Sequence, residues 1–566
     1  MSAPTASSQT GLTKIFIENF KGIGSEIRID LKPITLLFGA NSVGKSTIMQ
    51  ALQYVREVLE RNNANPDRTM QGGNFVDLGG FRNLVHLRDT TRHIAIQIEL
   101  SLGGKGLPDL VPEAFDDWQT DDSKVWAFYN LLHETRNRVE SVSVKLVIAW
   151  SHLRDKAVVI GYQVGANGEW LAEINATDDG RDVSISINEI NPIFMRQFTQ
   201  EDLDSNLEYY LRSNASSVAS GDSVAPNIET HYTIWPHIIE TVTDAGMEKT
   251  GEGLREWLSG FDSALPRLGE LLHIPAPDVI GAENVYIARE FTAFISSLIV
   301  GPGLLVRDEL RKMRYVGPIR HVPARDFDAS LTKDEAGWAD GLAGWEALLT
   351  GQQSLIDDVS RWMADEDKLN TGYAIERRWV REVRSEWLDL IGSEELNPQR
   401  KWMLNKAIEA LLTKPRIGLI DTKSGLEMQS RDVGIGISQV LPVVVAALES
   451  SASLVTIEQP ELHIHPSVQV GLGDLLIYSV LRHEMSFLIE THSEHLILRL
   501  LRRIRETSEG NLPSGFPSVS PEMIGVYYVG RGENGVQIKS LPVDEAGEFT
   551  ESWPKGFFDE RAGELF

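Results

Sequence analysis

Residues 39–46 read GANSVGKS, between a short apolar run and a long amphipathic segment. The run ITLLFG (34–39) has the length of a buried strand, and residues 46–62 have helical spacing. In a strand–loop–helix unit of this kind, the glycines let the loop turn its backbone N–H groups inward around an anion. Lys45 adds a positive charge for the terminal phosphates, and Ser46 offers a hydroxyl to Mg²⁺. The pattern predicts a site for a nucleoside triphosphate.

The phosphate-binding residues are expected in the loop and at the start of the helix, where the helix N-terminus also favours an anion. They are Gly39, Ala40, Asn41, Ser42, Val43, Gly44, Lys45, Ser46 and Thr47.

Composition limits the remaining possibilities. The 566 residues are enough for two or three domains, and the absence of cysteine excludes disulfides and thiolate metal sites. The apolar run VLPVVVAAL is too short to span a bilayer, and the polar segment MSAPTASSQTG lacks the apolar core of a signal peptide. We expect a cytoplasmic protein. The net charge is −27, whereas a protein that binds nucleic acid over a broad surface is normally basic there.

The sequence changes character twice along the chain. Residues 1–195 contain the phosphate loop and several alternating runs, such as HIAIQIELSL and SVSVKLVIAW, which predict an antiparallel β subdomain. Residues 196–414 have mostly helical spacing and predict a helical insertion. From 415 to 566, runs such as RIGLID, SLVTIE and SFLIET alternate with helical segments, which predicts an α/β half with buried parallel strands.

The second half supplies a candidate ligand for a metal ion. SLVTIE ends in Glu458, whose carboxylate can hold Mg²⁺ directly or through water. A glycine-containing stretch, SRDVGIGISQVLP, lies just before that strand, and its Ser438 and Gln439 are expected to open an apolar helix. Exposed N–H groups at such a helix start attract anions. The alternative is that Ser438 is only the N-cap of the helix, and both roles are compatible.

Residues 13–47, with Asn19 and Phe20 on a strand before the phosphate loop, resemble the opening of SMC, RecF and OLD-type ATPases. The stretches DVGIGISQVLP, IEQPELHIHP, ETHSEH, WPKGFFDE and YVGPIRHVPAR (315–325) are similar to bacterial OLD-like ATPases, some of which belong to antiphage systems such as Septu and PARIS. The resemblance implies an ABC-type P-loop ATPase head that uses ATP and Mg²⁺ and pairs with a second head. It also implies that His492 contacts the γ-phosphate and that Gly436, Ser438 and Gln439 belong to a signature that binds the γ-phosphate held by another subunit.

The same resemblance places Gln459 where the catalytic carboxylate usually stands. An amide can orient water but cannot take its proton at neutral pH. Because phosphoryl transfer depends mostly on positioning and charge neutralisation, the loss of a base need not abolish turnover. Glu461 and Glu490 are the two acids that could replace it, and each could instead be a solvated or helix-capping residue. We expect a slow ATPase.

Several other features are weaker candidates for function. His463 and His465 alternate on an extended segment with no third ligand nearby, so we expect a structural role. The last seventy residues contain no acidic pattern typical of a nuclease, so none is expected in this chain. The basic stretches RHVPAR, ERRWVREVR and LRLLRRIR are the only local candidates for nucleic-acid contact.

Together these features predict an ATPase that forms homodimers or higher oligomers around ATP and regulates a partner effector, plausibly a nuclease, without contacting a membrane. The alternative is a DNA-repair or structural-maintenance ATPase that acts on DNA directly.

Overall fold

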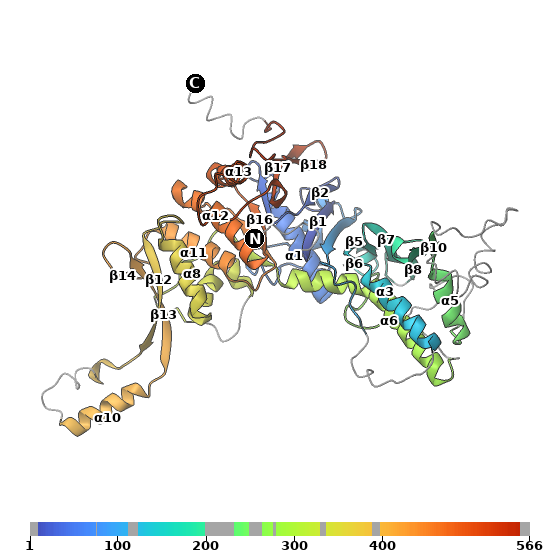
Figure 1. Ribbon diagram of the computed structural model, residues 1–566, viewed down its shortest axis with the longest axis horizontal. Coiled ribbons are helices and arrows are strands. Elements are labelled where there is room, and N and C mark those ends of the chain that lie inside the picture. Colours follow the sequence, from blue (N-terminus) through green and yellow to red (C-terminus); the bar gives the residue numbers. More distant parts are fainter. Residues whose placement is uncertain are drawn as a thin grey trace.

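The computed structural model describes residues 10–74, 76–110, 123–180, 182–197, 231–247, 263–274, 279–325, 327–328, 335–387 and 397–554. The molecule is elongated, with a central body from which an arm ending in helix α10 (Pro398–Glu409) projects on one side (Figure 1). On the other side the chain extends toward helix α5 (Trp235–Asp244). Part of the WPKGFFDE stretch, residues 555–560, lies outside the described residues.

The body is built on a six-stranded sheet with the order β11-β15-β16-β3-β17-β18. Neighbouring strands are parallel except for the edge strand β18, which runs antiparallel to β17. The strands β3 and β15 are mostly apolar and are buried at every position, as expected for parallel strands in a sheet covered on both faces. The strands are β11 (Arg314–Val316), β15 (Leu454–Glu458), β16 (Ser486–Glu490), β3 (Ile34–Phe38), β17 (Ile524–Gly532) and β18 (Gly535–Ser540).

Helices cover both faces of this sheet. On one face, Leu37 and Leu488 pack in one hydrophobic core with helix α1 (Lys45–Arg61). On the other, Leu36 and Ile457 pack in a second core. The helices of that second core are α7 (Leu342–Thr350), α8 (Gln353–Ala364), α11 (Ile435–Leu448), α12 (Pro466–His483) and α13 (Glu494–Ser508).

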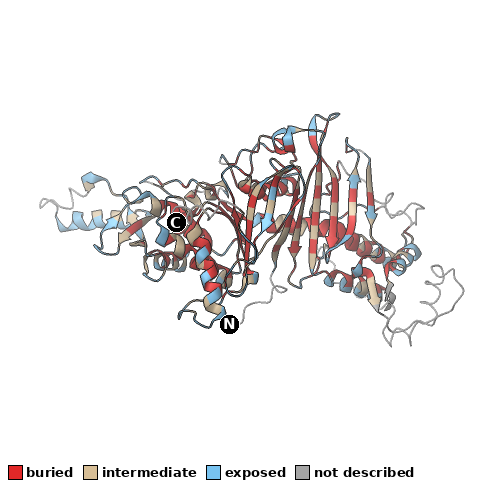
Figure 2. Ribbon diagram, turned by 90° about the horizontal axis from the view of Figure 1, so that it is seen from above, coloured by how far each residue is buried: buried red, intermediate tan, exposed pale blue. Residues whose placement is uncertain are grey.

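A second, seven-stranded antiparallel sheet has the order β2-β1-β4-β5-β6-β7-β8. Buried and half-buried residues alternate along β4 (Ile94–Ser101), as the sequence pattern predicts for a sheet with one face on a core (Figure 2). Helix α6 (Ala282–Arg311) packs against this sheet, and α3 (Ser123–Asn137) packs on α6. The other strands are β1 (Gly11–Glu18), β2 (Ile27–Asp30), β5 (Ser141–Ser151), β6 (Lys156–Ala166), β7 (Glu169–Ala176) and β8 (Val183–Ile187).

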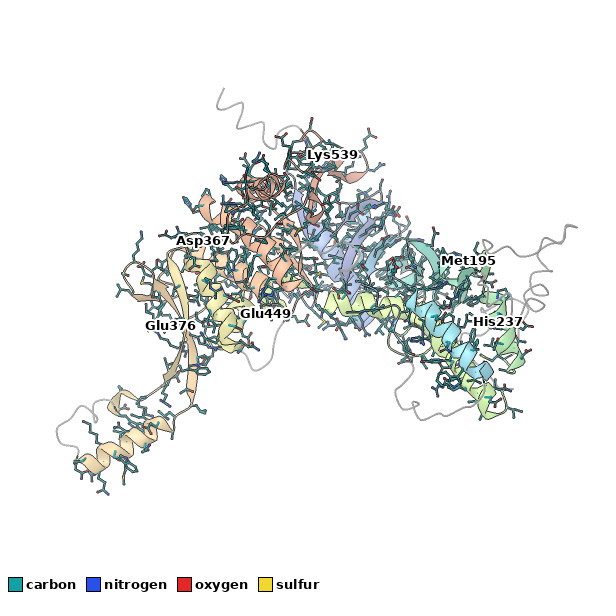
Figure 3. The ribbon with its side chains drawn as sticks, viewed as in Figure 1. Met195, His237, Asp367, Glu376, Glu449 and Lys539 are labelled. Atoms are coloured by element: carbon teal, nitrogen blue, oxygen red, sulfur yellow. The ribbon has the colours of Figure 1, made fainter. Side chains whose placement is uncertain are left out.

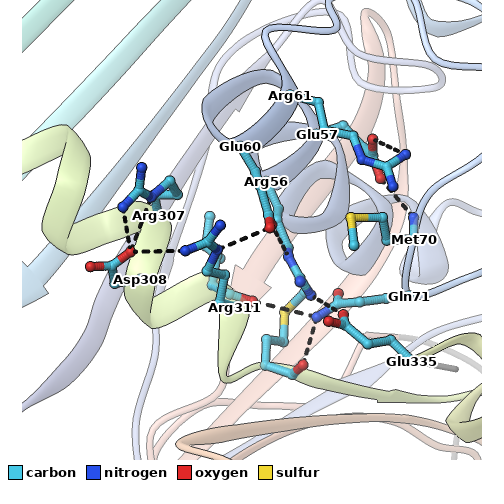
Figure 4. A network of polar contacts seen from close by, with 12 residues as sticks. Arg56, Glu57, Glu60, Arg61, Met70, Gln71, Arg307, Asp308, Arg311 and Glu335 are labelled. Carbon is cyan, nitrogen blue, oxygen red and sulfur yellow. Dashed lines mark hydrogen bonds and ion pairs between the residues drawn. The ribbon is translucent and has the colours of Figure 1, made fainter. Parts of the chain in front are cut away.

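Helix α1 is linked to α6 by a network of ion pairs around the buried Arg56. The Arg56 guanidinium contacts the carboxylates of Glu60 at 2.9 Å and Glu335 at 2.7 Å, and Arg311 on α6 reaches Glu60 at 2.9 Å (Figure 4). Among the described helices, α6 alone is long and apolar enough to cross a membrane, and most of its apolar stretch is buried inside the fold.

The predicted α/β P-loop fold with an antiparallel β subdomain is confirmed, with differences in the middle of the chain. Residues 196–414 contain helices, but they also supply β11 to the nucleotide sheet and β12 (Tyr373–Arg381) to the arm. The strand around RIGLID is β13 (Thr413–Asp421), which pairs antiparallel with β12 and β14 (Glu427–Met428). It therefore lies outside the parallel sheet in which we expected it.

The arm is formed by the antiparallel strands β12 and β13, with α10 beyond their end, and Figure 3 labels Glu376 on β12. A small two-stranded sheet of β9 (Met195–Gln197) and β10 (His231–Thr233) lies beside α5.

Candidate functional site

The phosphate loop connects β3 to α1, as the sequence predicts. Ala40, Asn41 and Ser42 are exposed at its tip, whereas Val43, Lys45 and Thr47 are buried. Gly39 and Gly44 have φ values of 148° and 110°, which side chains disfavour. A Cβ atom at Gly39 would lie 2.2 Å from the carbonyl oxygen of Val529, so only glycine fits there.

Lys45 is positioned by acceptors at the base of the loop. Its Nζ donates to the carbonyls of Gly39 at 3.0 Å and Ala40 at 2.9 Å, and lies 3.6 Å from Oε1 of Glu490. Burial lowers the pKa of Lys45, and the charge of Glu490 opposes that effect. The amine is therefore held under the loop, where an incoming phosphate can take it over from the carbonyls.

The Ser46 hydroxyl joins two carboxylates from neighbouring strands. Its Oγ lies 2.6 Å from Oε2 of Glu490 and 3.1 Å from Oε2 of Glu458. Glu458 and Glu490 are register partners at the ends of β15 and β16, so their side chains emerge together. One hydroxyl and two carboxylates are suitable ligands for Mg²⁺, which usually binds few protein oxygens together with substrate phosphates.

Burial raises the pKa of Glu458 to about 7, and repulsion from Glu490 adds to the shift. Opposing contributions come from hydrogen bonds, including one from the Tyr315 hydroxyl to Oε1 of Glu458 at 2.8 Å. The single hydrogen of the Ser46 hydroxyl can be donated to only one of the two carboxylates. A protonated Glu458 would donate its own hydrogen to Ser46 Oγ, which satisfies both contacts when no metal is bound.

This raised pKa predicts how stability depends on pH. The unfolded pKa of a glutamate is about 4.3, so the favourable contribution of neutral Glu458 is complete below that value and is lost as the pH rises through about 7. The melting temperature of nucleotide-free, metal-free protein should fall by a few degrees between about pH 5.5 and about pH 8. In Glu458→Gln much of that fall should vanish, because an amide does not ionise. Calorimetry that gave the same fall in both proteins would contradict the assignment.

Gln459 begins a loop that bends sharply after β15. Its backbone is left-handed, with φ of 45°, and its N–H donates to the carbonyl of Glu490 at 2.8 Å. Glu461 further along the loop accepts from the Thr491 hydroxyl at 2.8 Å and from the backbone N–H of His492 at 2.6 Å. The carboxylate of Glu461 thus holds the loop to the end of β16.

The three histidines singled out from the sequence, His463, His465 and His492, have different environments. Burial, and after it the positive charge of Lys45, lowers the pKa of His492, which favours a neutral ring beside the phosphate loop. His465 caps α12, because its Nδ1 accepts from the N–H of Ser467 at 3.2 Å. His463 is exposed and has a left-handed backbone with φ of 61°.

Helix α11 starts earlier than the sequence interpretation expected. Its N-cap is Gly434, and Ser438 lies one turn inside the helix, fully buried, with its hydroxyl donating to the carbonyl of Ser430 at 3.3 Å. The alternative that Ser438 is the N-cap is therefore wrong. The first N–H groups of this helix belong to Gly434, Ile435 and Gly436, of which the first two residues are exposed, and the two glycines were the available signal for that start.

Two residues that contact the site had no assigned role from sequence. Tyr315 on β11 donates to Glu458, and Arg320, in the loop that follows, reaches the backbone carbonyl of Glu458 at 2.7 Å. Both belong to the stretch YVGPIRHVPAR, whose only signal was its resemblance to OLD-like ATPases. The Gln439 side chain also contacts Arg320, with Nε2 donating to the Arg320 carbonyl at 2.5 Å.

Comparisons with known families identify ATPase sequence in both halves of the chain. Residues 11–218 match the family described as "AAA ATPase domain", and residues 346–499 match "AAA domain, putative AbiEii toxin, Type IV TA system". Residues 519–566 match "Protein of unknown function (DUF3696)". Two segments of the chain are thus similar to AAA-type ATPase domains, and the first of them includes the phosphate loop. No curated protein matches the sequence.

Solved structures similar to the chain include heads of SMC proteins. The SmcHead bound to the C-winged helix domain of ScpA has a TM-score of 0.35 and 11% identity, and the match covers 95% of this chain and 99% of that one. The Smc head from Pyrococcus furiosus bound to the C-terminal domain of ScpA also has 0.35 and 11%, with 98% of both chains covered. The SMC head domain from Thermotoga maritima has 0.33 and 8%, with 94% and 100% covered.

Proposed function

We propose that the chain is a slow ATPase in which ATP and Mg²⁺ are held between two copies. The observation that carries the proposal is the cluster at the phosphate loop. Lys45, the Ser46 hydroxyl, Glu458 and Glu490 converge there within hydrogen-bond or ion-pair distance. Lys45 and the loop N–H groups would bind the phosphates, and Ser46 with the two carboxylates would hold Mg²⁺. Held by these residues, Mg²⁺ would supply positive charge to offset the negative charge of the phosphates.

Slow turnover is supported by where the carboxylates lie. Glu458 and Glu490 both contact Ser46, which places them on the metal side of the site. Both oxygens of Glu461 accept hydrogen bonds from the end of β16. Gln459 therefore stands at the position where the resemblance places the catalytic base. Its amide can orient the attacking water but cannot deprotonate it.

Pairing of two copies is supported by the exposed start of α11. Gly434 is exposed, and a Cβ atom there would meet nothing within 4 Å. Ile435 beside it is 57% exposed although it is a large apolar residue. The N–H groups at the start of this helix would bind the γ-phosphate held by the second copy. Ser438 would stabilise this helix start through its hydrogen bond to the carbonyl of Ser430.

Gly434→Arg tests this pairing without disturbing the phosphate loop. Its φ of −59° suits any side chain, so the variant should fold and bind ATP normally. A large cation at the helix start should prevent docking of the second copy, so ATP-dependent dimers should disappear and hydrolysis should fall at least about tenfold. Gly434→Ala is the matched control and should pair normally. Light scattering that detected ATP-dependent dimers of Gly434→Arg would remove α11 from the interface.

We propose further that the ATP-bound pair controls a partner effector, a nuclease, in the cytoplasm as part of antiphage defence. The support is the family description that names a toxin of a toxin–antitoxin system, together with the resemblance to OLD-like ATPases. The projecting arm is a suitable contact element, because Trp402 and Met403 on α10 and Trp379 on β12 are largely exposed. The chain itself is expected to cut neither DNA nor RNA.

The alternative, direct action on DNA, receives little support from the basic stretches. Arg320 of RHVPAR is buried, and Arg325 pairs with Asp432 at 3.0 Å. Arg378 of ERRWVREVR pairs with Glu376 at 2.8 Å, and Arg503 of LRLLRRIR pairs with Asp474 at 2.7 Å. Arg325, Arg378 and Arg503 thus already have carboxylate partners within the fold, and Arg320 is not accessible to DNA. Hydrolysis stimulated by DNA alone would favour the alternative.

A further inference from the structure

Arg320 is a buried cation with an unusual set of partners. Its side chain is 1% exposed, and Nη2 donates to the backbone carbonyls of Glu458 at 2.7 Å and Gln459 at 3.2 Å. Its Nη1 donates to the carbonyl of Gln439 at 3.3 Å. Among the described residues, no carboxylate lies within ion-pair distance of this guanidinium. A buried guanidinium is costly to desolvate, but here its hydrogen bonds tie the end of β15 to helix α11, a link that an apolar side chain could not make.

Gln439 completes a reciprocal contact with the same residue. Its Oε1 accepts from the backbone N–H of Arg320 at 3.2 Å, and its Nε2 donates to the Arg320 carbonyl. Each side chain thus binds the backbone of the other, and any shift of the first turns of α11 must move Arg320. The start of α11 also packs closely on the loop that follows β15. A Cβ atom added at Gly436 would come within 2.7 Å of the His463 carbonyl oxygen.

At its other end Arg320 holds a strained residue. Gln459 has a left-handed backbone that side chains disfavour, so the conformation must be maintained by its surroundings. Arg320 binds its carbonyl, and the carbonyl of Glu490 binds its N–H. The direction of the Gln459 side chain therefore depends on where Arg320 lies.

We propose that Arg320 is a positioning residue that links the start of α11 to Gln459 and Glu458, and so couples the two ATP sites of a pair. The inference rests on the proposed pairing. In a pair, α11 of one copy contacts the nucleotide of the other, whereas Gln459 of that copy serves its own nucleotide. When α11 docks on the nucleotide of the other copy, Gln439 and Arg320 therefore change the position of Gln459 at the copy's own nucleotide. The two sites then hydrolyse ATP cooperatively.

The test is steady-state hydrolysis as a function of ATP concentration, with binding measured separately by calorimetry. The wild-type curve should be sigmoidal, with a Hill coefficient clearly above one. Arg320→Lys keeps the charge but cannot reach three carbonyls, so the curve should become hyperbolic and kcat should fall by about five- to a hundredfold. The affinity of the single copy for ATP should stay within about twofold, because the phosphate loop is untouched.

Gln439→Met breaks the same link from the helix side without removing the charge, and it serves if Arg320→Lys does not fold. It should give the same hyperbolic curve. The kcat of the double variant should be no lower than that of the more impaired single variant. Arg325→Lys, on an exposed residue of the same stretch, is the control and should behave as wild type.

The outcomes separate the inference from the proposed function. Failure of the wild type to bind or hydrolyse ATP would reject the proposed function and the coupling with it. If the wild type hydrolyses ATP with a hyperbolic curve, or if folded Arg320→Lys and Gln439→Met retain its Hill coefficient and kcat, the coupling alone is rejected.

Discussion

Lys45→Ala is expected to weaken ATP binding by at least about a hundredfold, within the range for truncating a buried, hydrogen-bonded charge. The amine is buried under the loop, bonded to the carbonyls of Gly39 and Ala40. Without it, the phosphates would meet two carbonyl oxygens and the carboxylate of Glu490 with no charge to balance them. Isothermal calorimetry with ATP and Mg²⁺ measures the loss directly.

Two controls make the Lys45→Ala result interpretable. Lys312→Ala removes a largely exposed lysine that pairs with Glu309, so it should leave ATP affinity unchanged. A melting curve of Lys45→Ala should show a folded protein. Unchanged ATP affinity in a folded Lys45→Ala protein would mean that the nucleotide binds elsewhere.

Gln459→Glu is expected to raise turnover by about ten- to a hundredfold, the usual contribution of a general base. The new carboxylate would stand beside the attacking water, while Glu458 and Glu490 remain with Ser46 on the metal side. Steady-state phosphate release at saturating ATP measures the gain. Glu458→Gln should lose activity in the same assay, because it removes a proposed Mg²⁺ ligand.

Glu461→Gln and Glu490→Gln distinguish a lost base from a relocated one. If Glu490 is a metal-side acid, Glu490→Gln should raise the Mg²⁺ concentration needed for half-maximal activity. If Glu461 holds the loop to β16, Glu461→Gln should act mainly on stability. A fast wild-type enzyme that ignores Gln459→Glu but is inactivated by one of these changes would show that the base has moved.

The elements around the candidate site that sequence predicted correctly are those fixed by local pattern. Strand, loop and helix around Lys45 follow from consecutive residues, and the burial of β15 and β16 follows from their apolar runs. The end of β16 also places Glu490 beside Glu458, because parallel neighbours in register end at the same edge. The sequence interpretation considered Glu490 as a base, but its contact with Ser46 favours the metal side.

The parts that sequence missed depend on distant pairing. Arg320 and Glu458 are 138 positions apart, and β11 has only three residues, too few for a recognisable pattern. The charged stretch ERRWVR is a strand because β13 pairs with it, not because of its own composition. The sequence interpretation placed Ser438 at the start of a helix because it follows two glycines. In the structure those two glycines themselves form the N-terminus of α11.

The central claim, that ATP brings two copies together, is tested most directly by the molar mass of the wild-type protein in solution. Light scattering should be recorded with ATP and Mg²⁺, with ADP and Mg²⁺, and without nucleotide. We expect the mass to double with ATP and to return to the nucleotide-free value as ATP is slowly consumed. A mass that is the same in all three conditions, in protein shown by calorimetry to bind ATP, would contradict the account.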